Sequence, residues 1–304
     1  MKILFTGASS FTGYWFVKEL AAEGHDVWAT FRSSLDDYQG IRRERVDRLL
    51  NHCTPIFRCF FGSEKFLDLS GLETFDVICH HASEVANYKS EDFDPVKALG
   101  NNTKNIRKIL NYFKPKGLVL TGSIAEQNEG QCSDQNRAFS PYGLSKFFSS
   151  EWIQYIARQH NTPFKKFVIP NPFGPYEEER FTTWLIKNWF AGHVPEVRTP
   201  FYIRDNIHVS LLAKSYVAFV NDSRPKLNPS GYPFSQEEFT KLFATKMQHH
   251  LGLPCEFTSF SQVDFPEPKI RINSDRILAK DWDEELAWKE LADYYEHRYS
   301  GVYA

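Results

Sequence analysis

Residues 2–13 read Lys2-Ile3-Leu4-Phe5-Thr6-Gly7-Ala8-Ser9-Ser10-Phe11-Thr12-Gly13. The apolar run predicts a buried strand, Gly7 permits a tight turn, and Gly13 lets a following helix pack closely. The first N–H groups of such a helix favour an anion. In isolation, the stretch is equally typical of a strand–turn–helix that binds no ligand. The usual pattern has another glycine at Ser10, whose hydroxyl adds a donor here. The residues that we expect to contact a dinucleotide pyrophosphate are Gly7, Ser9, Ser10, Phe11, Thr12 and Gly13.

Outward from this stretch, short apolar runs alternate with helical patterns through the first half of the chain. The runs that predict strands are Lys2–Thr6, Asp26–Thr30, Ile56–Phe61, Phe75–Cys79, Gly117–Thr121 and Phe164–Ile169. The patterns that predict helices are Phe11–Ala22, Gln39–Asn51, Pro95–Phe113 and Tyr142–Gln159. This alternation predicts an α/β fold with a parallel, doubly wound sheet covered by helices on both faces.

After about residue 170 the pattern loosens into loops and four predicted helices. These helices are Thr182–Ala191, Val209–Val220, Ser235–Leu251 and Asp283–Tyr295. Ser235 and Glu238 have the spacing of a capping box. We expect residues 1–170 to form a dinucleotide-binding domain. Residues 171–304 should form mainly a smaller mixed lobe that binds the substrate, with about 202–222 returning to the first domain.

Composition narrows the classes of function. The formal net charge of the 304 residues is −2, which gives no electrostatic reason to expect nucleic acid or an anionic membrane. The five cysteines show no Cys-x-x-Cys spacing, which is typical of reduced thiols in a cytoplasm. No apolar stretch is long enough for a signal peptide or a membrane helix. The pairs His80-His81 and His249-His250 lack partners at ligand spacing, so we predict no metal site.

The end of the second predicted strand bears on the choice of cofactor. NAD requires a carboxylate there for the ribose 2′-hydroxyl, whereas the 2′-phosphate of NADP requires a cation. The chain reads Val27-Trp28-Ala29-Thr30-Phe31-Arg32-Ser33-Ser34, with no acid before Asp36. Arg32 and Ser33 can bind a phosphate, so we favour NADP over NAD. Arg32 is also compatible with a solvated loop charge.

Ser123, Tyr142 and Lys146 form the candidate catalytic group. Tyr142 and Lys146 are four residues apart, so they share one face of a helix, for which Ser140 is a suitable N-cap. Ser123 ends an apolar run. A free tyrosine has a pKa near 10, and a neighbouring ammonium group favours its phenolate. The three residues predict proton transfer coupled to hydride transfer, although any amphipathic helix can contain a Tyr-x-x-x-Lys.

Three further motifs accompany the glycine turn and this triad. Asp76-Val77-Ile78-Cys79-His80-His81-Ala82 is similar to an Asp-x-Val-x-His-x-Ala strand, and Pro170-Asn171-Pro172-Phe173-Gly174-Pro175 to an Asn-x-Tyr-Gly-Pro turn. Arg204-Asp205-Asn206-Ile207-His208-Val209 is close to Arg-Asp-Phe-Ile-His-Val. With these motifs, nearly the whole chain resembles the extended short-chain dehydrogenase/reductase family, in particular its nucleotide-sugar epimerases, dehydratases and reductases.

The resemblance implies a Rossmann domain and roles for particular residues. The cofactor would meet His80, Ala82, Tyr142, Lys146 and Pro170 besides the glycine turn. The nucleotide sugar would meet Asn171, Arg204, whose guanidinium would grip the diphosphate, and Glu126. The family's helix Asn corresponds to Leu99, with Asn101 or Asn102 as substitutes after a shift. The resemblance also suggests a homodimer through the Tyr142 helix.

Departures from the family narrow the reaction. Glu126-Gln127-Asn128-Glu129-Gly130 replaces the Val-Tyr-Gly that follows the catalytic serine, so the substrate-facing loop differs. Family dehydratases have an Asp-Glu pair directly after the catalytic hydroxyl, where this chain has Ile124 and Ala125. Dehydration is therefore disfavoured. With the Arg32 interpretation, we favour an NADPH-dependent reductase of a keto nucleotide sugar. The alternatives are a nucleotide-sugar epimerase and a non-catalytic regulator that senses the cofactor.

Overall fold

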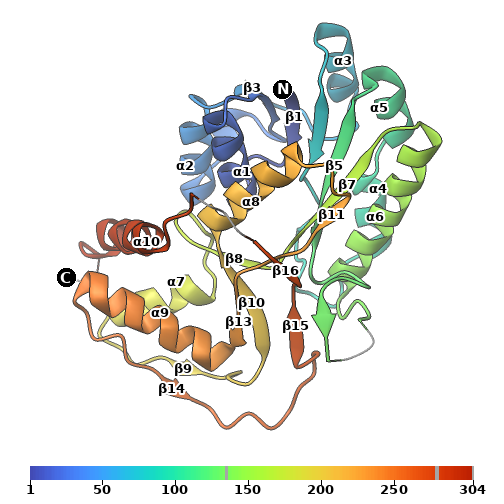
Figure 1. The fold of residues 1–304 in the computed structure, drawn as a ribbon. Coiled ribbons are helices and arrows are strands. Elements are labelled where there is room, and N and C mark those ends of the chain that lie inside the picture. Colours follow the sequence, from blue (N-terminus) through green and yellow to red (C-terminus); the bar gives the residue numbers. More distant parts are fainter. Residues whose placement is uncertain (134–135, 278–280, 303–304) are drawn as a thin grey trace. The chain divides into compact units, whose positions relative to one another are not determined.

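The computed structural model describes residues 1–133, 136–277 and 281–302, and the chain divides into two compact units (Figure 1). The first unit consists of residues 1–129, 136–169 and 213–228. The second unit consists of the described residues within 130–135, 170–212 and 229–304. The later segment that returns to the first unit is thus 213–228, whereas the sequence predicts about 202–222.

A parallel sheet forms the centre of the first unit, in the strand order β11-β7-β5-β4-β1-β2-β3. Its strands are β1 (Lys2–Thr6), β2 (Asp26–Thr30), β3 (Thr54–Ile56), β4 (Val77–His80), β5 (Gly117–Ser123), β7 (Phe164–Ile169) and β11 (Lys226–Leu227). All of these neighbours pair in parallel. The predicted doubly wound α/β sheet is confirmed. Because the strands are parallel, their carboxyl ends meet at one edge of the sheet.

Helices lie on both faces of this sheet, with α1 and α2 on one face and α4, α5 and α6 on the other (Figure 1). The helices and the short 3-10 turn of this part are α1 (Phe11–Ala22), η1 (Leu35–Asp37), α2 (Gly40–Leu49), α3 (Glu64–Leu72), α4 (Pro95–Asn102), α5 (Ile106–Phe113), α6 (Pro141–Gln159) and α8 (Val209–Asn221). In α5 the buried residues recur with helical spacing and join the core beneath the sheet. They are Ile106, Ile109, Leu110 and Phe113.

Two predicted elements of the first unit differ from the structure. The single helix predicted over Pro95–Phe113 is two helices, because Asn105 between them has a φ of 56° and donates its side chain to the Gly62 carbonyl at 2.8 Å. The strand predicted over Ile56–Phe61 ends at Ile56. Arg58, with a φ of 52°, turns the chain away from the sheet.

In its described residues, the second unit contains a five-stranded mixed sheet and the helices α7, α9 and α10. The sheet contains β13 (Tyr232–Ser235), β10 (Ile203–His208), β15 (Ile270–Ile272) and β6 (Gln131–Cys132), with β8 (Asn171–Phe173) also on β10. The two-residue strands β9 (Glu196–Val197), β12 (Pro229–Ser230), β14 (Thr258–Ser259) and β16 (Asp275–Arg276) pair as β9–β14 and β12–β16. The helices are α7 (Phe181–Phe190), α9 (Gln236–Leu251) and α10 (Glu284–Tyr299). The capping box of Ser235 and Glu238 begins α9, as predicted.

The five cysteines are all unpaired. Cys79 lies on β4 in the first unit, and Cys255 lies in the second unit; both are buried. Burial raises the pKa of each of these two thiols to about 12. At neutral pH both therefore stay protonated.

Candidate active site

The glycine turn between β1 and α1 is shaped by contacts within the chain. Gly7 has a φ of 83°, and a Cβ there would lie 2.8 Å from the Ala82 nitrogen. A Cβ on Gly13 would lie 2.2 Å from the Gly7 carbonyl oxygen. The Ser10 hydroxyl donates to that oxygen at 2.9 Å and accepts from the Gly13 N–H at 3.1 Å. Both glycines are therefore required by the turn itself, and the Ser10 hydroxyl is already donated within it.

The same turn suits an anion. Ser10 caps α1 with extended backbone angles, and the first turn of α1 holds no acidic residue. Helix N-termini of this kind attract phosphate through their N–H groups and their dipole. The residues present thus fit the pyrophosphate of a dinucleotide, with backbone groups rather than the Ser10 side chain as the available donors.

His81 connects this turn to β5, a role that the sequence analysis missed. Its Nε2 lies 3.0 Å from the Ser10 Oγ and 3.1 Å from the Thr12 Oγ1, and its Nδ1 lies 3.0 Å from the Thr121 Oγ1. Burial lowers the pKa of His81 to about 3, so the ring is neutral at pH 7. Because the ring is neutral, one of its two nitrogens donates and the other accepts in these contacts. The sequence did contain a signal for this role of His81, since a polar residue here lies just beyond a predicted parallel strand.

His80, which the resemblance places at the cofactor, lies in the core with 2% exposure. Its Nδ1 lies 3.0 Å from the Thr6 Oγ1, and its Nε2 lies 2.9 Å from the Asn102 carbonyl. Burial lowers the pKa of His80 to about 3. The Thr6 hydroxyl also accepts from the Ala82 N–H at 3.0 Å. His80 therefore supports the turn from beneath, and its direct contact with a cofactor stays a prediction.

Asn102 is one of the three candidates, with Leu99 and Asn101, for the position of the family's helix Asn. Its Oδ1 accepts from the Glu84 N–H at 2.8 Å, and its Nδ2 donates to the Ser149 Oγ at 3.2 Å. Ser149 lies on α6, so Asn102 links α4, the loop after β4 and the helix that carries Tyr142 and Lys146.

The three predicted catalytic residues all lie in the first unit. Ser123 is the last residue of β5, Tyr142 lies in the first turn of α6, and Lys146 follows one turn later. Ser140 caps α6 by accepting from the Gly143 N–H at 3.1 Å. A Cβ on Gly143 would lie 2.2 Å from the carbonyl oxygen of Ala125, which follows β5. The absence of a side chain at Gly143 thus brings α6 against the end of β5.

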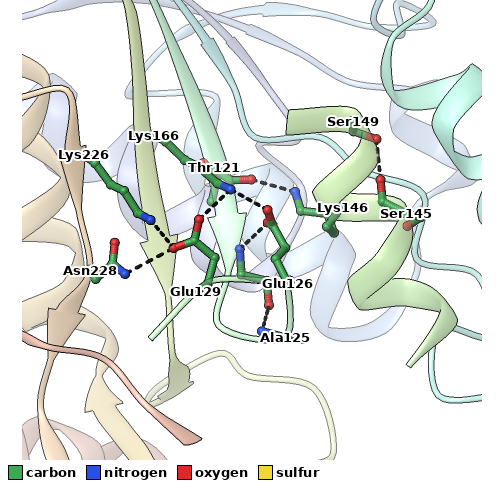
Figure 2. A network of polar contacts seen from close by, with 11 residues as sticks. Thr121, Ala125, Glu126, Glu129, Ser145, Lys146, Ser149, Lys166, Lys226 and Asn228 are labelled. Atoms are coloured by element: carbon green, nitrogen blue, oxygen red, sulfur yellow. Dashed lines mark hydrogen bonds and ion pairs between the residues drawn. The ribbon is translucent and has the colours of Figure 1, made fainter. Parts of the chain in front are cut away.

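Lys146 is buried beside β5. Its Nζ donates to the Thr121 carbonyl at 2.6 Å (Figure 2). Burial lowers the pKa of Lys146 to about 8, with Glu126 opposing this shift and Lys166 adding to it. The Tyr142 ring makes edge contacts with Tyr88 at 5.3 Å and with Phe93 at 6.0 Å between ring centroids. This end of the sheet therefore places a phenol and an ammonium group of lowered pKa on one helix next to Ser123.

Both carboxylate oxygens of Glu126 bond inside the first unit, and its contact with a substrate stays a prediction. The side chain is fully buried. One oxygen accepts from the Ser123 N–H at 2.7 Å, and the other accepts from the Lys166 ammonium at 2.6 Å (Figure 2). The sequence placed Glu126 on a substrate-facing loop because the buried lysine, 40 residues away, becomes a neighbour only when β5 and β7 pair.

The end of β2 contains the two residues predicted to select NADP. The Arg32 side chain is 77% exposed, and its Nη1 lies 3.9 Å from a carboxylate oxygen of Glu84. The Ser33 N–H donates to the Tyr38 hydroxyl at 3.3 Å. Phe31, directly after the strand, is buried. A cation is thus present at this position, but it faces a carboxylate, and its role toward a 2′-phosphate stays a prediction.

Asn171 and Arg204 come together within the second unit, which also contains Pro170. Asn171 on β8 lies opposite Asn206 on β10. Arg204 lies two residues before Asn206, so alternation of side chains along β10 puts Arg204 on the same face of the sheet. The two predicted substrate residues thus share one face.

The Arg204 guanidinium has partners in its own unit. Its Nη1 lies within 3.2 Å of the carbonyl oxygens of Ile203, Pro268 and Lys269. Its Nη2 donates to Glu267 at 3.0 Å, and the ring of Tyr202 lies 4.3 Å below the guanidinium. Arg204 thus fixes the segment before β15, and its grip on a diphosphate stays a prediction.

The described residues were also considered for a metal site and for membrane-spanning helices. In residues 1–133, 136–277 and 281–302, no three His, Cys, Asp or Glu side chains gather as they would around a metal ion. None of the helices in these ranges is long and apolar enough to cross a membrane.

The fold and the site together define a doubly wound α/β protein with a Ser-Tyr-Lys group beside a glycine turn. Residues 3–231 match the model of the NAD dependent epimerase/dehydratase family, and the chain belongs to that family. None of the curated proteins matches the chain.

Similar solved structures include nucleotide-sugar enzymes. UDP-glucose 4-epimerase from Thermotoga maritima is 16% identical, with 98% of this chain and 99% of that chain covered and a TM-score of 0.73. UDP-glucuronic acid 4-epimerase from Bacillus cereus is 15% identical, with 98% and 100% covered and a TM-score of 0.74. The dTDP-glucose 4,6-dehydratase DesIV from Streptomyces venezuelae is 14% identical, with 98% and 97% covered and a TM-score of 0.71. At these identities the likeness establishes the fold alone.

Proposed function

We propose that the chain catalyses reversible oxidation at a hydroxyl-bearing carbon of a nucleotide sugar and inverts that carbon, as a nucleotide-sugar epimerase does. One observation carries the proposal: Gly143 lets α6, the helix of Tyr142 and Lys146, approach the end of β5, where Ser123 is the last residue. The family, and the 4-epimerases among the similar structures, support the substrate class.

Tyr142 acts as the proton acceptor and donor in this proposal. As a phenolate it takes the proton of the sugar hydroxyl, and as a phenol it returns a proton to the carbonyl oxygen. The Lys146 ammonium, buried one turn away, stabilises the phenolate through its charge. The Ser123 Oγ accepts from the Ala125 N–H at 3.2 Å, which leaves its own hydrogen to bond the sugar oxygen.

NAD, when bound, would supply the hydride acceptor and donor. The glycine turn would hold its pyrophosphate through the backbone of residues 7–13 and the first turn of α1. Lys146 would also reach the nicotinamide ribose. The match to an NAD dependent family supports NAD rather than NADP as the cofactor of this proposal.

A second candidate is the NADPH-dependent reductase of a keto nucleotide sugar favoured by the sequence. The specific observation for it is the end of β2, where Phe31 is buried and the next side chain is the exposed cation Arg32. Dehydration has no such support. Ile124 and Ala125 carry no acid, and the Glu126 carboxylate is held by Ser123 and Lys166.

The nucleotide released on denaturing the purified protein separates the candidates. Stoichiometric NAD, together with interconversion of a sugar such as UDP-glucose without net cofactor use, supports the epimerase. An empty protein that prefers NADPH and oxidises it with a keto nucleotide sugar supports the reductase. Binding of a dinucleotide without turnover of any nucleotide sugar supports the regulator.

Replacement of the phenol tests the mechanism. Tyr142→Phe should lower kcat about 100-fold or more, because general acid–base catalysis of this kind contributes that much, while the Kd for the cofactor stays within a factor of about three. Tyr155→Phe on the exposed face of α6 is the matched control and should leave kcat unchanged. A Tyr142→Phe enzyme as active as the wild type would contradict the assignment.

The exposed face of α6 supports the predicted homodimer. Phe148, Trp152 and Tyr155 lie on this face with about two-fifths of each side chain exposed, and the Arg107 guanidinium lies 5.7 Å from the Trp152 ring. Contiguous exposed aromatic side chains are typical of interfaces. We propose a second copy of this chain as their partner, to be tested by the molar mass in solution from light scattering.

A further inference from the structure

A cluster of buried charges lies directly beneath the end of β5. The Lys166 ammonium on β7 lies 2.6 Å from Glu126 and 2.8 Å from Glu129. Glu129 also pairs with Lys226 and accepts from the Asn228 amide at 3.2 Å. We call these five residues the buried charge cluster (Figure 2). Its two carboxylates and the Lys166 ammonium are buried, whereas the second ammonium group, on Lys226, is 43% exposed. Buried charges stay charged when they are paired in this way.

The end of β5 leaves one backbone donor without a strand to receive it. The Ile124 N–H donates to the Ile169 carbonyl on β7 at 3.0 Å. Since N–H groups alternate in direction along a strand, the Ser123 N–H points to the side of β4. The last residue of β5 that pairs with β4 is Leu120, because β4 ends at His80. The Glu126 carboxylate takes the place of the missing strand by accepting the Ser123 N–H at 2.7 Å.

The remaining bonds of this turn also converge on Ser123. The Glu126 N–H donates back to the Ser123 carbonyl at 3.0 Å. The Ala125 N–H donates to the Ser123 Oγ at 3.2 Å. The carboxylate of Glu126 therefore closes a small ring around the serine whose hydroxyl faces the reacting oxygen in the proposed mechanism.

Gly122 makes room for the ion pair that holds this carboxylate. A Cβ at Gly122 would lie 2.6 Å from the Lys166 Cε and 3.0 Å from a Glu126 carboxylate oxygen. The pair thus occupies the space beside the strand that a side chain would fill, one residue before Ser123. Because Lys166 is held in turn by β7 and by Glu129, the Glu126 carboxylate has little freedom to move.

We propose that Glu126, held by Lys166, is a positioning residue that fixes the Ser123 backbone and aims its hydroxyl at the substrate oxygen. This inference rests on the proposed function for its catalytic consequence. Its structural part, that the carboxylate oxygen holds the Ser123 N–H, stands independently. A purely structural cluster would need only the balance of charge, whereas a positioning residue needs the acceptor oxygen.

Two double variants separate these roles. Glu126→Gln with Lys166→Met removes the ion pair but keeps an acceptor oxygen for the Ser123 N–H. Glu126→Met with Lys166→Met removes both the ion pair and the acceptor. In both variants Glu129 keeps Lys226, and the buried Lys146 loses the charges of Glu126 and Lys166 alike. The two proteins differ in one side chain of similar length, and their melting temperatures serve as the check that both fold.

The first readout is turnover of the nucleotide sugar that the wild type converts fastest. The kcat of the Gln/Met variant should exceed that of the Met/Met variant about tenfold or more, because a small displacement of a catalytic group costs rates of this size. The KM and the cofactor Kd should be alike in the two variants. Equal kcat values in the two variants would overturn the proposal, whether both are active or both are impaired.

The second readout needs no substrate. Hydrogen exchange of the peptide that contains Ser123 should be faster in the Met/Met variant by one amide and unchanged in the Gln/Met variant. If the wild type converts no nucleotide sugar, the proposed function fails, yet this exchange still decides the positioning role. Equal exchange in all three proteins would overturn it.

Discussion

The carboxyl ends of β1 and β5 lie at the same edge of one sheet, but different chemical groups surround them. The end of β1 uses backbone groups, the Ser10 and Thr12 hydroxyls and a neutral His81. The end of β5 uses the buried charge cluster and Lys146. The buried Arg45 guanidinium also donates to the Ser9 carbonyl of the glycine turn at 3.1 Å. The end of β1 thus combines one cation with neutral groups, as suits an anion, whereas the end of β5 combines carboxylates with ammonium groups.

Thr121 joins the two ends. Its hydroxyl lies 3.0 Å from the Nδ1 of His81, and the Nε2 of His81 lies 3.0 Å from the Ser10 Oγ in the glycine turn. Its carbonyl accepts from the Lys146 ammonium. One residue of β5 thus bonds to both regions, so the position of the turn and the position of the catalytic lysine are not independent.

The largest expected effect comes from breaking the charged end. Lys166→Met should lower the free energy of unfolding by about 3 to 5 kcal/mol, because it leaves the Glu126 carboxylate buried without its cation. Urea denaturation measures this change. Lys116→Met is the matched control: its ion pair with Asp76 spans 2.7 Å, close to the 2.6 Å between Lys166 and Glu126, but its lysine is 82% exposed. Exposed pairs contribute about 1 kcal/mol or less. Equal losses in the two variants would contradict the importance of burial.

The end of β1 should break through shape rather than charge. Gly13→Ala should lower the free energy of unfolding by about 1 to 3 kcal/mol, since the new Cβ would lie 2.2 Å from the Gly7 carbonyl oxygen. Cofactor affinity, measured by calorimetry, should fall with it. Gly71→Ala in α3, where no atom lies within 4 Å of the new Cβ, should instead stabilise the protein by about 0.5 to 1 kcal/mol.

The smallest effect sharpens the comparison through pH. Since burial lowers the pKa of Lys146 to about 8, its ammonium is lost above that pH and kcat should fall there. The stability contribution has the opposite sign. A lysine whose pKa is lowered in the folded state is easier to bury once neutral, so its cost disappears as pH rises from about 8 toward 10.5. Lys146→Arg keeps its charge and should lack this limb in a kcat–pH profile; an unchanged limb would assign it to another group.

The elements that the sequence predicts correctly depend on neighbours along the chain. The apolar runs of β1, β2 and β7 and the capping box before α9 were placed to within a residue, because each signal lies within a few positions. Ser123, Tyr142 and Lys146 were proposed as catalytic residues from their order, whereas the role of Gly143 in bringing α6 against β5 was not predicted.

The features that were missed depend on distant partners. Glu126 is buried because Lys166 is its ion-pair partner, and the neutral ring of His81 bonds to Ser10 and Thr121. Such contacts arise only after strand order and register are known. The break at Asn105 was also invisible, because its cause is a hydrogen bond to the distant Gly62 carbonyl.

The unpaired cysteines give each unit a chemical reporter of its own. A thiol reacts with an alkylating reagent as its thiolate, and Cys79 and Cys255 have raised pKa values and little exposed surface. Each should be modified only when its surroundings open. Mass spectrometry of the labelled peptides would then follow the opening of the two units separately, at native positions and without an engineered probe.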